Sequence, residues 1–562
     1  MQSIITMKIN TRSWSGVLPV SVALDGRFFS CEYDCSFCPN ECREQGAEQT
    51  ISRSYLSSEG TFKRGRVSEF DPARQVIRRL FELQEMGHVP DKLEIIVLGG
   101  TWDCHPREYR EAFIHGIYYG CNIFADLDAT AWLEKKPFQH HLPLDNEMMA
   151  RCRPRESLEE EKTRNETRPL ARIVGLVLET RPDRISVASM TELRRFGCTR
   201  VQLGLQHTDD DILQRNRRGH CVLAGVLAIE RLKNNGFKVD GHLMPDLPYA
   251  SPEADARMFE IVFESEDYQL DYVKIYPCLS LPFTTARRWK DEGVWTPYAE
   301  SDYPLFVRTL AEGIARVKPW TRINRVHRDF PEASEKNMRL GYESETIRTN
   351  LNQYVQQYMA RHHLPMRDIR SREIKNNQTI TVEGSDLWIR SYRANGATEY
   401  FLSVEKEGVL FGFVRLRLPP AQKKCTSLFP FLRRDGIARI RELHVYGFIA
   451  GTTGKQSIQH KGIGKFLMWC AENVAVYHGC HTTAVISGVG VREYYRRLGY
   501  HLEKDCNEFM LKTVRPAFSV FTNPFFVLSS IRLRYGLYRK YIRLRPITWF
   551  DILLSKIVSW IK

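Results

Sequence analysis

Residues 31–38 of the chain read Cys31-Glu-Tyr-Asp-Cys35-Ser-Phe-Cys38, so three cysteines fall within one short stretch. Sulfurs placed this close together are typical ligands of a soft metal ion or of an iron–sulfur cluster. Three thiolates on a [4Fe–4S] cluster leave one iron without a protein ligand. Two alternatives remain open, a zinc site completed by Cys42 or a histidine, and a chance grouping. The stretch therefore predicts a metal centre, and an iron–sulfur cluster is favoured.

The spacing C-x3-C-x2-C, with the aromatic Phe37 just before the last cysteine, resembles the signature of the radical S-adenosylmethionine enzymes. In that superfamily the open iron is chelated by the amino and carboxylate groups of the methionine part. The resemblance implies that Cys31, Cys35 and Cys38 bind a [4Fe–4S] cluster, and that S-adenosylmethionine binds next to it.

The 562 residues include 81 Lys and Arg against 67 Asp and Glu, a net charge of +14. This excess favours a polyanionic partner, which is a nucleic acid, a nucleotide cofactor or an anionic membrane surface. The 14 cysteines form no disulfide framework outside the 31–42 group, and residues 1–10 lack the apolar core of a signal peptide. We therefore expect a reducing, cytoplasmic location.

Predicted strands alternate with predicted helices over residues 16–330. Apolar, β-branched runs predict strands at 16–24, 93–98, 172–179, 199–205, 237–244 and 271–276. Helices are predicted from Asp71-Pro72, from about Glu108, up to Gly197 and over 221–235. This alternation indicates βαβ units with a parallel sheet, arranged as a full or partial βα barrel. Residues 134–169 are polar and charged and predict an inserted surface segment.

Unusual peptides follow successive predicted strands, at the end where parallel barrels build their active sites. We therefore expect one mouth to be lined by the cysteine loop, Gly99-Gly100-Thr101, Glu179, Gln206, Asp246 and Lys274. The alternative is that the Gly-Gly and Pro-Asp-Leu-Pro peptides are only turns.

A second domain is predicted at 379–515, after a short N-terminal segment (1–15), the barrel (16–330) and a basic connecting region (331–378). Its alternating pattern predicts antiparallel strands at 378–383, 387–391, 400–405, 409–418 and 440–446. A helix at 466–476 is preceded by Gln459-His-Lys-Gly462-Ile-Gly464-Lys465. Glycines at such a position let backbone N–H groups approach a pyrophosphate.

This motif resembles the coenzyme A loop of the GNAT acyltransferases, which have an α+β fold. The resemblance implies that Gln459, Lys461, Gly462 and Gly464 bind the pyrophosphate of acetyl-CoA. A strand at 484–487, a short helix carrying Tyr494-Tyr495 and a final strand to Lys512 are also GNAT-like. For the two tyrosines, packing in the core is the alternative to a contact with the cofactor.

A radical S-adenosylmethionine barrel followed by a GNAT domain resembles one family, the catalytic subunit of Elongator and its single-subunit archaeal and bacterial relatives. The matching peptides include Thr11-Arg-Ser-Trp-Ser-Gly16, Leu98-Gly-Gly-Thr101, Glu179-Thr-Arg-Pro-Asp183, Arg218-Gly-His220, Gly241-His-Leu-Met-Pro-Asp-Leu-Pro248, Lys274-Ile-Tyr276-Pro277, Arg325-Val-His-Arg-Asp329, Arg441-Glu-Leu-His-Val-Tyr-Gly447 and Val485-Ile-Ser-Gly-Val-Gly490. In that family the first two cysteines are usually further apart, whereas here the spacing is the shorter, general one.

The resemblance implies carboxymethylation of carbon 5 of the wobble uridine (U34) of tRNA. Residues Gly99-Gly100-Thr101, Glu179 and Gln206 would hold S-adenosylmethionine, whose cleavage gives a deoxyadenosyl radical. That radical would abstract hydrogen from the methyl group of acetyl-CoA, and the carbon radical would add to the uracil before the thioester is hydrolysed. Lys274, Tyr494 and Tyr495 would be catalytic, the first at the barrel mouth and the tyrosines beside the acetyl group. Expected partners are tRNA, Elongator-like accessory subunits and a second copy of the chain.

The tail, 516–562, holds eight Lys and Arg against Asp551 alone, with aromatic residues between them. Its longest uncharged stretch, 516–531, contains Asn523-Pro524 and is shorter than the ~20 residues of a spanning helix. Three interpretations stay open. The tail could be a peripheral membrane contact, an RNA-binding arm or a segment packed on its own domain.

Two other function classes compete with the radical enzyme. A protein or histone lysine acetyltransferase would use the barrel only as a scaffold, and would have no use for three cluster cysteines. A non-catalytic assembly subunit would tolerate the loss of Gly462, Gly464 or a cluster cysteine, and none is lost. The sequence therefore favours the radical tRNA-modifying enzyme.

Overall fold

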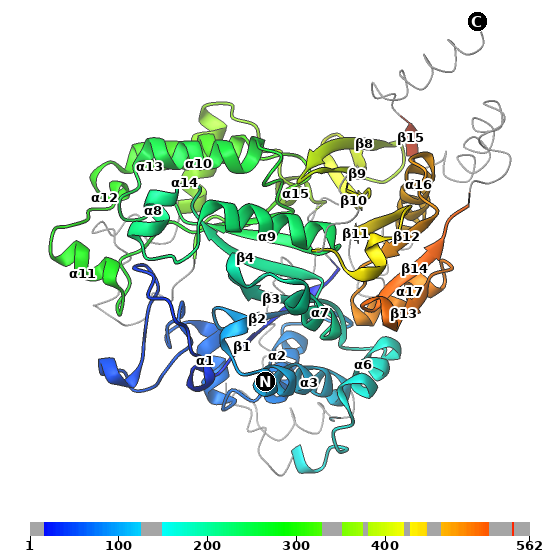
Figure 1. The fold of residues 1–562 in the computed structure, drawn as a ribbon, viewed down its shortest axis with the longest axis horizontal. Helices are drawn as coiled ribbons and strands as arrows, with labels where there is room; N and C mark the ends of the chain where they lie inside the picture. The colour runs from blue at the N-terminus through cyan, green and yellow to red at the C-terminus, as the bar shows by residue number, and fades with distance from the viewer. Residues whose placement is uncertain are drawn as a thin grey trace, which may run out of the picture.

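The computed structural model describes residues 16–124, 127, 149–328, 351–374, 380–420, 427–446, 462–515 and 542–544. Two β-sheets organise these residues, each with its own helices (Figure 1).

The first sheet has seven strands whose order in the sheet is their order in the chain, and each pairs in parallel with the next. The strands are β1 (Leu18–Ala23), β2 (Lys92–Leu98), β3 (Arg172–Thr180), β4 (Arg200–Gln206), β5 (Lys238–Leu243), β6 (Tyr272–Ile275) and β7 (Arg322–Arg325). In this order β1 and β7 are the edges, so the sheet is a partial barrel. The six predicted strands are confirmed, and β7 was not predicted.

Helices connect these strands along the chain. They are α1 (Gly60–Val67), α2 (Pro72–Glu85), α3 (Arg107–Ile123), α6 (Leu158–Thr167), α7 (Val187–Arg195), α8 (Asp210–Arg215), α9 (Val222–Asn234), α10 (Pro252–Glu264), α11 (Thr285–Asp291), α12 (Tyr298–Ser301) and α13 (Tyr303–Ala315). α2 begins as predicted, because the Asp71 side chain accepts a hydrogen bond from the Arg74 N–H and Pro72 takes the first helical position. Its buried Val76, Ile77 and Leu80 share one core with the strands.

The second sheet has the strand order β13-β14-β12-β11-β10-β9-β8-β15. The strands are β8 (Ser385–Ala394), β9 (Ala397–Lys406), β10 (Val409–Arg417), β11 (Ile437–Val445), β12 (Thr482–Val485), β13 (His501–Glu503), β14 (Phe509–Thr513) and β15 (Ile542–Leu544), and the helices are α16 (Ile463–Tyr477) and α17 (Arg492–Arg496). β8 to β11 form an antiparallel meander, whereas β11 and β12 are parallel. The predicted strand at 378–383 is wrong where it is described, since residues 380–383 form no strand. Two further helices, α14 (Leu351–Arg361) and α15 (Ile369–Arg372), lie in the connecting region.

A buried network of charged side chains joins the two sheets. The Arg441 guanidinium (β11) donates to the Asp271 carboxylate, at the start of β6, with 2.8 Å between Nη1 and Oδ1. Arg415 (β10) donates through Nε to Glu442 over 2.8 Å, and the Tyr272 hydroxyl donates to the same carboxylate. All five side chains are buried. The positive charge of Arg415, with the Tyr272 hydrogen bond, lowers the pKa of Glu442 to about 2 in spite of its burial.

Part of the segment predicted as a surface insertion lies at the same interface. α6 begins with a capping box formed by Ser157 and Glu160, yet its Lys162 is only 1% exposed. Lys162 pairs with Glu508 of the second domain, and Glu166 pairs with Arg492 over 2.8 Å. The expectation of a surface segment is therefore wrong for α6, because Lys162 and Glu166 form ion pairs with the second domain. Residues 134–148 lie outside the described part of the chain.

We predict that Asp271→Asn lowers the free energy of unfolding by about 3–5 kcal/mol, because it removes one buried carboxylate that two buried guanidinium groups share and leaves them only Glu442 and Glu399. The asparagine keeps the size of the side chain and its acceptor for the Val239 N–H, so the loss reports on charge. Urea unfolding measures the change.

The matched control is Arg308→Met, which breaks the exposed Arg308–Glu312 pair on α13. Exposed pairs of this kind contribute about 0.3–0.5 kcal/mol. Equal losses in the two variants would show that the buried network does not carry the interface.

Candidate active site

The cysteine loop follows β1 and is fixed by contacts with Asn216, just after α8, and with Ala286 of α11. The Ser36 side chain donates to Asn216 Oδ1 over 2.5 Å, and the Ser36 backbone carbonyl accepts from the Ala286 N–H. Phe37 is buried in a small cluster that also contains Cys35 and Trp295. The position of the aromatic before the last cysteine is therefore explained by packing, which holds the loop against the barrel.

Positive charge surrounds the three cysteines. Arg181 and Arg218 place their Nη1 atoms 4.0 Å and 3.7 Å from the Cys35 sulfur, and Ser54 Oγ lies 3.2 Å from the sulfur of Cys38. A hydrogen bond from the Cys104 thiol, together with Arg181 and Arg53, lowers the pKa of Cys31 to about 6. Burial raises the pKa of Cys38 to about 11. Nearby guanidinium groups stabilise thiolates, so this donor set fits an iron–sulfur cluster.

The assignment of Cys31, Cys35 and Cys38 to a cluster stays a prediction. Over the described ranges, no three side chains of His, Cys, Asp or Glu are grouped so that they could hold one metal ion.

The Gly99-Gly100-Thr101 peptide follows β2 and lies against the cysteine loop. Gly100 has a φ of +74°, and a Cβ atom there would stand 2.7 Å from the Arg53 carbonyl oxygen, so only glycine fits. The Ser30 N–H donates to the Cys104 carbonyl a few residues further on. The predicted neighbourhood of the two peptides is confirmed, and their contacts with a cofactor stay predictions.

Four polar side chains meet inside the same end of the barrel. Glu179, at the end of β3, accepts a hydrogen bond from the Tyr55 hydroxyl over 2.7 Å, and its Oε1 lies 3.9 Å from His242 Nδ1. Burial raises the pKa of Glu179 and lowers that of His242 well below its usual value. Burial also lowers the pKa of Lys274, although Asp240 and Glu179 oppose this. Burial therefore disfavours the charged form of each of these three groups.

Gln206 and Asp246, also expected at this mouth, have different surroundings. Gln206 lines the cavity described below with a φ of +71°, and its Oε1 has no hydrogen-bond partner in the described chain. Strained backbone of this kind is common at binding sites. The expectation for Asp246 is wrong, because its carboxylate accepts from the Tyr298 and Ala299 N–H groups beside α12 and does not line the cavity.

At the other site, Gly462 caps α16 with a φ of +81°, which favours glycine. A Cβ on Gly464 would stand 2.7 Å from the Tyr494 hydroxyl, so α16 and α17 approach closely here. Tyr495 is buried in the core of the second domain beside Tyr500 and also lines the cavity described below, so its contact with the cofactor stays a prediction. Gln459 and Lys461 lie outside the described residues.

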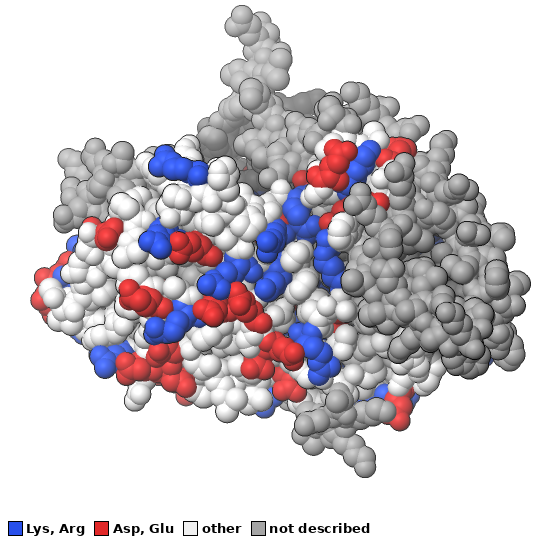
Figure 2. Space-filling view, turned by 90° about the horizontal axis from the view of Figure 1, so that it is seen from above, with Lys and Arg blue, Asp and Glu red and all other residues white. Residues whose placement is uncertain are grey.

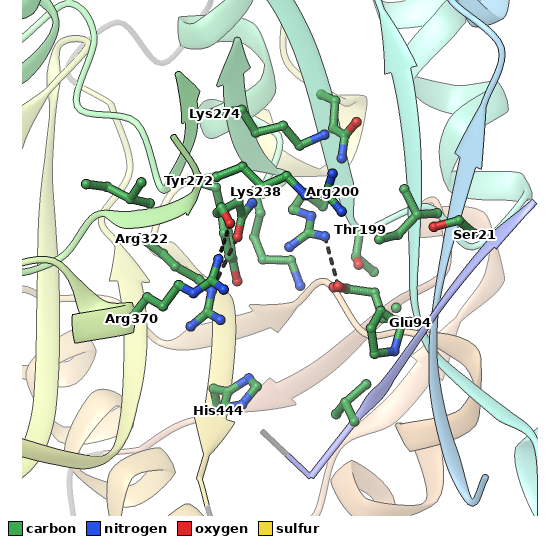
Figure 3. Close-up of a pocket in the computed structure, with 18 of the residues that line it drawn as sticks. Ser21, Glu94, Thr199, Arg200, Lys238, Tyr272, Lys274, Arg322, Arg370 and His444 are labelled. Atoms are coloured by element: carbon green, nitrogen blue, oxygen red, sulfur yellow. Dashed lines mark hydrogen bonds and ion pairs between the residues drawn. The ribbon is translucent and has the colours of Figure 1, made fainter. Parts of the chain in front are cut away.

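One cavity of about 2040 Å³ reaches both sites. Its lining includes Cys38, Glu179, Gln206 and Lys274 at one end and Gly462, Gly464 and Tyr494 at the other. Figure 3 shows charged side chains from several strands pointing into its middle. No site role was predicted for several of the lining residues, among them Glu94, Arg172, Arg200, Lys238, His242, Arg322, Arg370 and His444. The sequence signal that could have indicated them is a pair of charged residues two positions apart on an apolar strand, as at Lys92 and Glu94.

The charge distribution on the surface points to no particular partner. On the face drawn in Figure 2, Lys and Arg side chains are interspersed with Asp and Glu side chains of the described residues. None of the described helices is both long and apolar enough to cross a membrane. The tail contributes only β15 to the described structure, which pairs in parallel with β8 and forms one edge of the second sheet.

Comparison with known proteins places these features in one family. Residues 366–500 match the model of the Acetyltransferase (GNAT) family. The tRNA uridine(34) acetyltransferase of Dehalococcoides mccartyi (strain CBDB1) is 36% identical over 506 residues, 88% of this chain and 98% of that protein. Elongator complex protein 3 of Homo sapiens is 33% identical over 487 residues, 85% of this chain and 80% of that protein.

The chain belongs to the Elongator protein 3 family. A solved structure agrees with this assignment. The archaeal Methanocaldococcus infernus Elp3 with an N-terminal deletion (1–46) matches this chain with a TM-score of 0.67 and 30% sequence identity. That match covers 89% of this chain and 99% of the archaeal one. The predicted fold is thus confirmed as a partial βα barrel followed by a GNAT domain.

We predict that Cys35→Ala abolishes cluster binding, because two remaining thiolates cannot hold a [4Fe–4S] cluster in this loop. Iron and sulfide analysis after anaerobic reconstitution measures the loss, and CoA affinity should be unchanged. Cys121→Ala, which changes a buried cysteine of α3, should keep its full iron content. Full iron and sulfide in Cys35→Ala would overturn the cluster assignment.

Proposed function

We propose that this chain carboxymethylates carbon 5 of the wobble uridine of tRNA, using S-adenosylmethionine and acetyl-CoA. The single observation that carries the proposal is the cavity that reaches both the cysteine loop and the α16 N-terminus. The relatives named tRNA uridine(34) acetyltransferase support the substrate. The carbon–carbon bond is our addition, because uracil C5 does not react in simple acetyl transfer and calls for cofactor chemistry.

The cysteine loop supplies the metal side of this proposal. A [4Fe–4S] cluster with S-adenosylmethionine supplies a deoxyadenosyl radical when both are bound. The role of the chain is to hold the cluster through Cys31, Cys35 and Cys38 and to offset the negative charge of the thiolates with Arg181 and Arg218. Gly100, which can pack close to Arg53 because it has no Cβ, would present its backbone to the methionine part.

Lys274, Glu179 and His242 form the polar wall where the base and the radical would meet. His242 is neutral, because burial and the nearby cations lower its pKa, and it offers a ring nitrogen, Nε2, without a hydrogen-bond partner in the described residues. Lys274 carries a donor close to the Tyr276 ring, 5.9 Å from its centroid. We assign to Lys274 the contact with the uracil or the acyl carbonyl, and to Glu179 the control of the Lys274 charge.

The GNAT domain would hold acetyl-CoA. The N-terminus of α16 presents backbone N–H groups next to Gly462 and Gly464, which is the usual geometry for a pyrophosphate. Tyr494 lies beside Gly464 and lines the cavity, so it is placed to contact the cofactor. Tyr495 keeps a structural role in this proposal.

The competing function is a protein lysine acetyltransferase that uses the barrel as a scaffold. It is favoured only by the GNAT match, and it predicts transfer of an intact acetyl group. The two functions differ in the fate of the methyl hydrogens of acetyl-CoA, which remain in place during acetyl transfer.

The deciding experiment is an anaerobic reaction of the reconstituted chain with S-adenosylmethionine, a reductant, methyl-deuterated acetyl-CoA and unmodified tRNA. We expect deuterated carboxymethyluridine in the digested RNA and deuterium in the deoxyadenosine, both read by mass spectrometry. Acetylated lysine with no deuterium in deoxyadenosine would instead support the acetyltransferase. Neither product, from protein that holds its cluster, would contradict both enzymatic functions.

We predict that Lys274→Met lowers kcat by about 100-fold or more while the cluster content and CoA affinity stay unchanged, since the ammonium acts only at the reacting groups. Single-turnover formation of carboxymethyluridine measures the effect. Lys63→Met, at an exposed position on α1, is the control and should keep full activity. A similar small loss in both variants would remove Lys274 from the proposed site.

A further inference from the structure

Three polar residues form one row across the half-barrel. Glu179 on β3 is the register partner of Gln202 on β4, and Gln202 is in turn the register partner of Asp240 on β5. Register partners of a parallel sheet turn their side chains to the same face, and the cavity is lined by Glu179 and Gln202. The Gln202 amide therefore lies between two carboxyl groups on the inner wall of the barrel.

The orientation of the Gln202 amide is set by its neighbours. Its Nε2 atom donates to Asp240 Oδ2 over 3.5 Å, and Asn324 Nδ2 on β7 donates to the same oxygen over 2.9 Å. A carboxylate oxygen only accepts hydrogen bonds, so the reversed amide would bring two acceptors together. The Gln202 oxygen, Oε1, is thereby turned away from Asp240. It is buried and has no hydrogen-bond partner in the described residues.

Lys274 on β6 places a donor next to this acceptor. Burial lowers the pKa of Lys274, and Asp240 and Glu179 are the two carboxyl groups that oppose this effect most strongly. Coulomb effects fall with distance, so the ammonium lies near both ends of the row that holds Gln202. Figure 3 shows Lys274 extending into the cavity. A ligand at this place meets one acceptor and one donor side by side.

A donor beside an acceptor distinguishes uracil from cytosine. Uracil carries an N3–H donor between the carbonyl oxygens O2 and O4, whereas N3 of cytosine carries no hydrogen and is itself an acceptor. Cytosine would leave the buried oxygen of Gln202 facing another acceptor, which is costly. Hydrogen bonds at N3 also leave C5 and C6, on the other side of the ring, free to react.

We propose that Gln202 is a specificity-determining residue that reads the Watson–Crick edge of the wobble base. Its Oε1 accepts from uracil N3–H, and Lys274 donates to an adjacent carbonyl oxygen, O2 or O4. Asp240 is a positioning residue, because it holds the amide with its oxygen towards the base. The identity of the base rests on the proposed function, but the reading of N3 does not depend on whether a carboxymethyl group is added.

Binding of anticodon stem-loop RNA tests this reading. Three RNAs differ only at the wobble position, which carries uridine, 3-methyluridine or cytidine, and fluorescence anisotropy with the anaerobically reconstituted protein gives their dissociation constants. The phosphate contacts are the same in all three RNAs, so they cancel in the ratios. We expect uridine to bind about tenfold or more tightly than the other two, since each of those leaves Gln202 Oε1 without a donor.

Gln202→Leu removes the acceptor, so we expect both ratios to fall to about twofold or less while the RNA still binds. The matched control is Gln214→Leu, the same change at an exposed glutamine of α8 outside the cavity, which should keep both ratios. Unchanged ratios in folded Gln202→Leu would overturn the proposal. Equal affinities of the wild type for the three RNAs would also overturn it and would leave the proposed function standing.

Asp240→Asn tests the positioning role and keeps the size of the side chain, so it also serves if Gln202→Leu fails to fold. The new amide can donate to Gln202 Oε1, which lets the Gln202 amide turn and present Nε2 to the base. We expect the uridine-to-cytidine ratio to shift towards cytidine by about tenfold, because Nε2 can donate to cytosine N3. An equal loss of affinity for all three RNAs would contradict the positioning role. Ratios as expected without any carboxymethyluridine product would support the reading and count only against the proposed function.

Discussion

The ion pair between Arg441 and Asp271 fixes the two sheets relative to each other, and the cavity depends on that fixed relation. Both side chains are fully buried, so the pair forms only if each charge is closely matched. The neighbouring pair of Arg415 with Glu442 ties β10 and β11 to Tyr272 on β6. A hydrophobic contact would tolerate sliding, whereas these directional bonds define one orientation. The end of β11 that continues past its pairing with β12, residues 442–445, is thereby held against the interior of the half-barrel.

The interior of the half-barrel departs from the usual construction of βα barrels, whose centres are filled by branched apolar side chains. Here the inward positions carry Glu94, Arg200, Gln202, Lys238 and Lys274 around an open space. Charges and voids reduce stability, and the cost is offset outside the barrel, where helices such as α2 bury their apolar faces. An open edge between β1 and β7 makes the arrangement feasible, because a seven-stranded sheet need not close on itself.

Much of this fold was predictable because local signals agreed with the tertiary structure. The β-branched runs, the Asp71-Pro72 helix start and the glycines at 99–100 and 462 each have one physical reason that acts within a few residues. The failures share a different cause. α6 reads as a solvated helix because the partners of Lys162 and Glu166 lie more than 300 residues away, and β7 is short and charged because it lines the cavity. Asp246 shows the same limit, since the sequence cannot tell a carboxylate that caps a loop from one that faces a substrate.

The separation of the two candidate sites explains why the polar groups are distributed along the whole interior rather than at one mouth. A chemistry confined to the cysteine loop would need Glu179, His242 and Lys274 only, and the amino ends of the strands could be packed. Arg200 and Lys238 nevertheless lie at that end, with Thr199 Oγ1, which has no hydrogen-bond partner in the described residues. They line the part of the cavity that joins the cysteine loop to the α16 N-terminus, so the polar character of the interior extends over the whole space between the two sites.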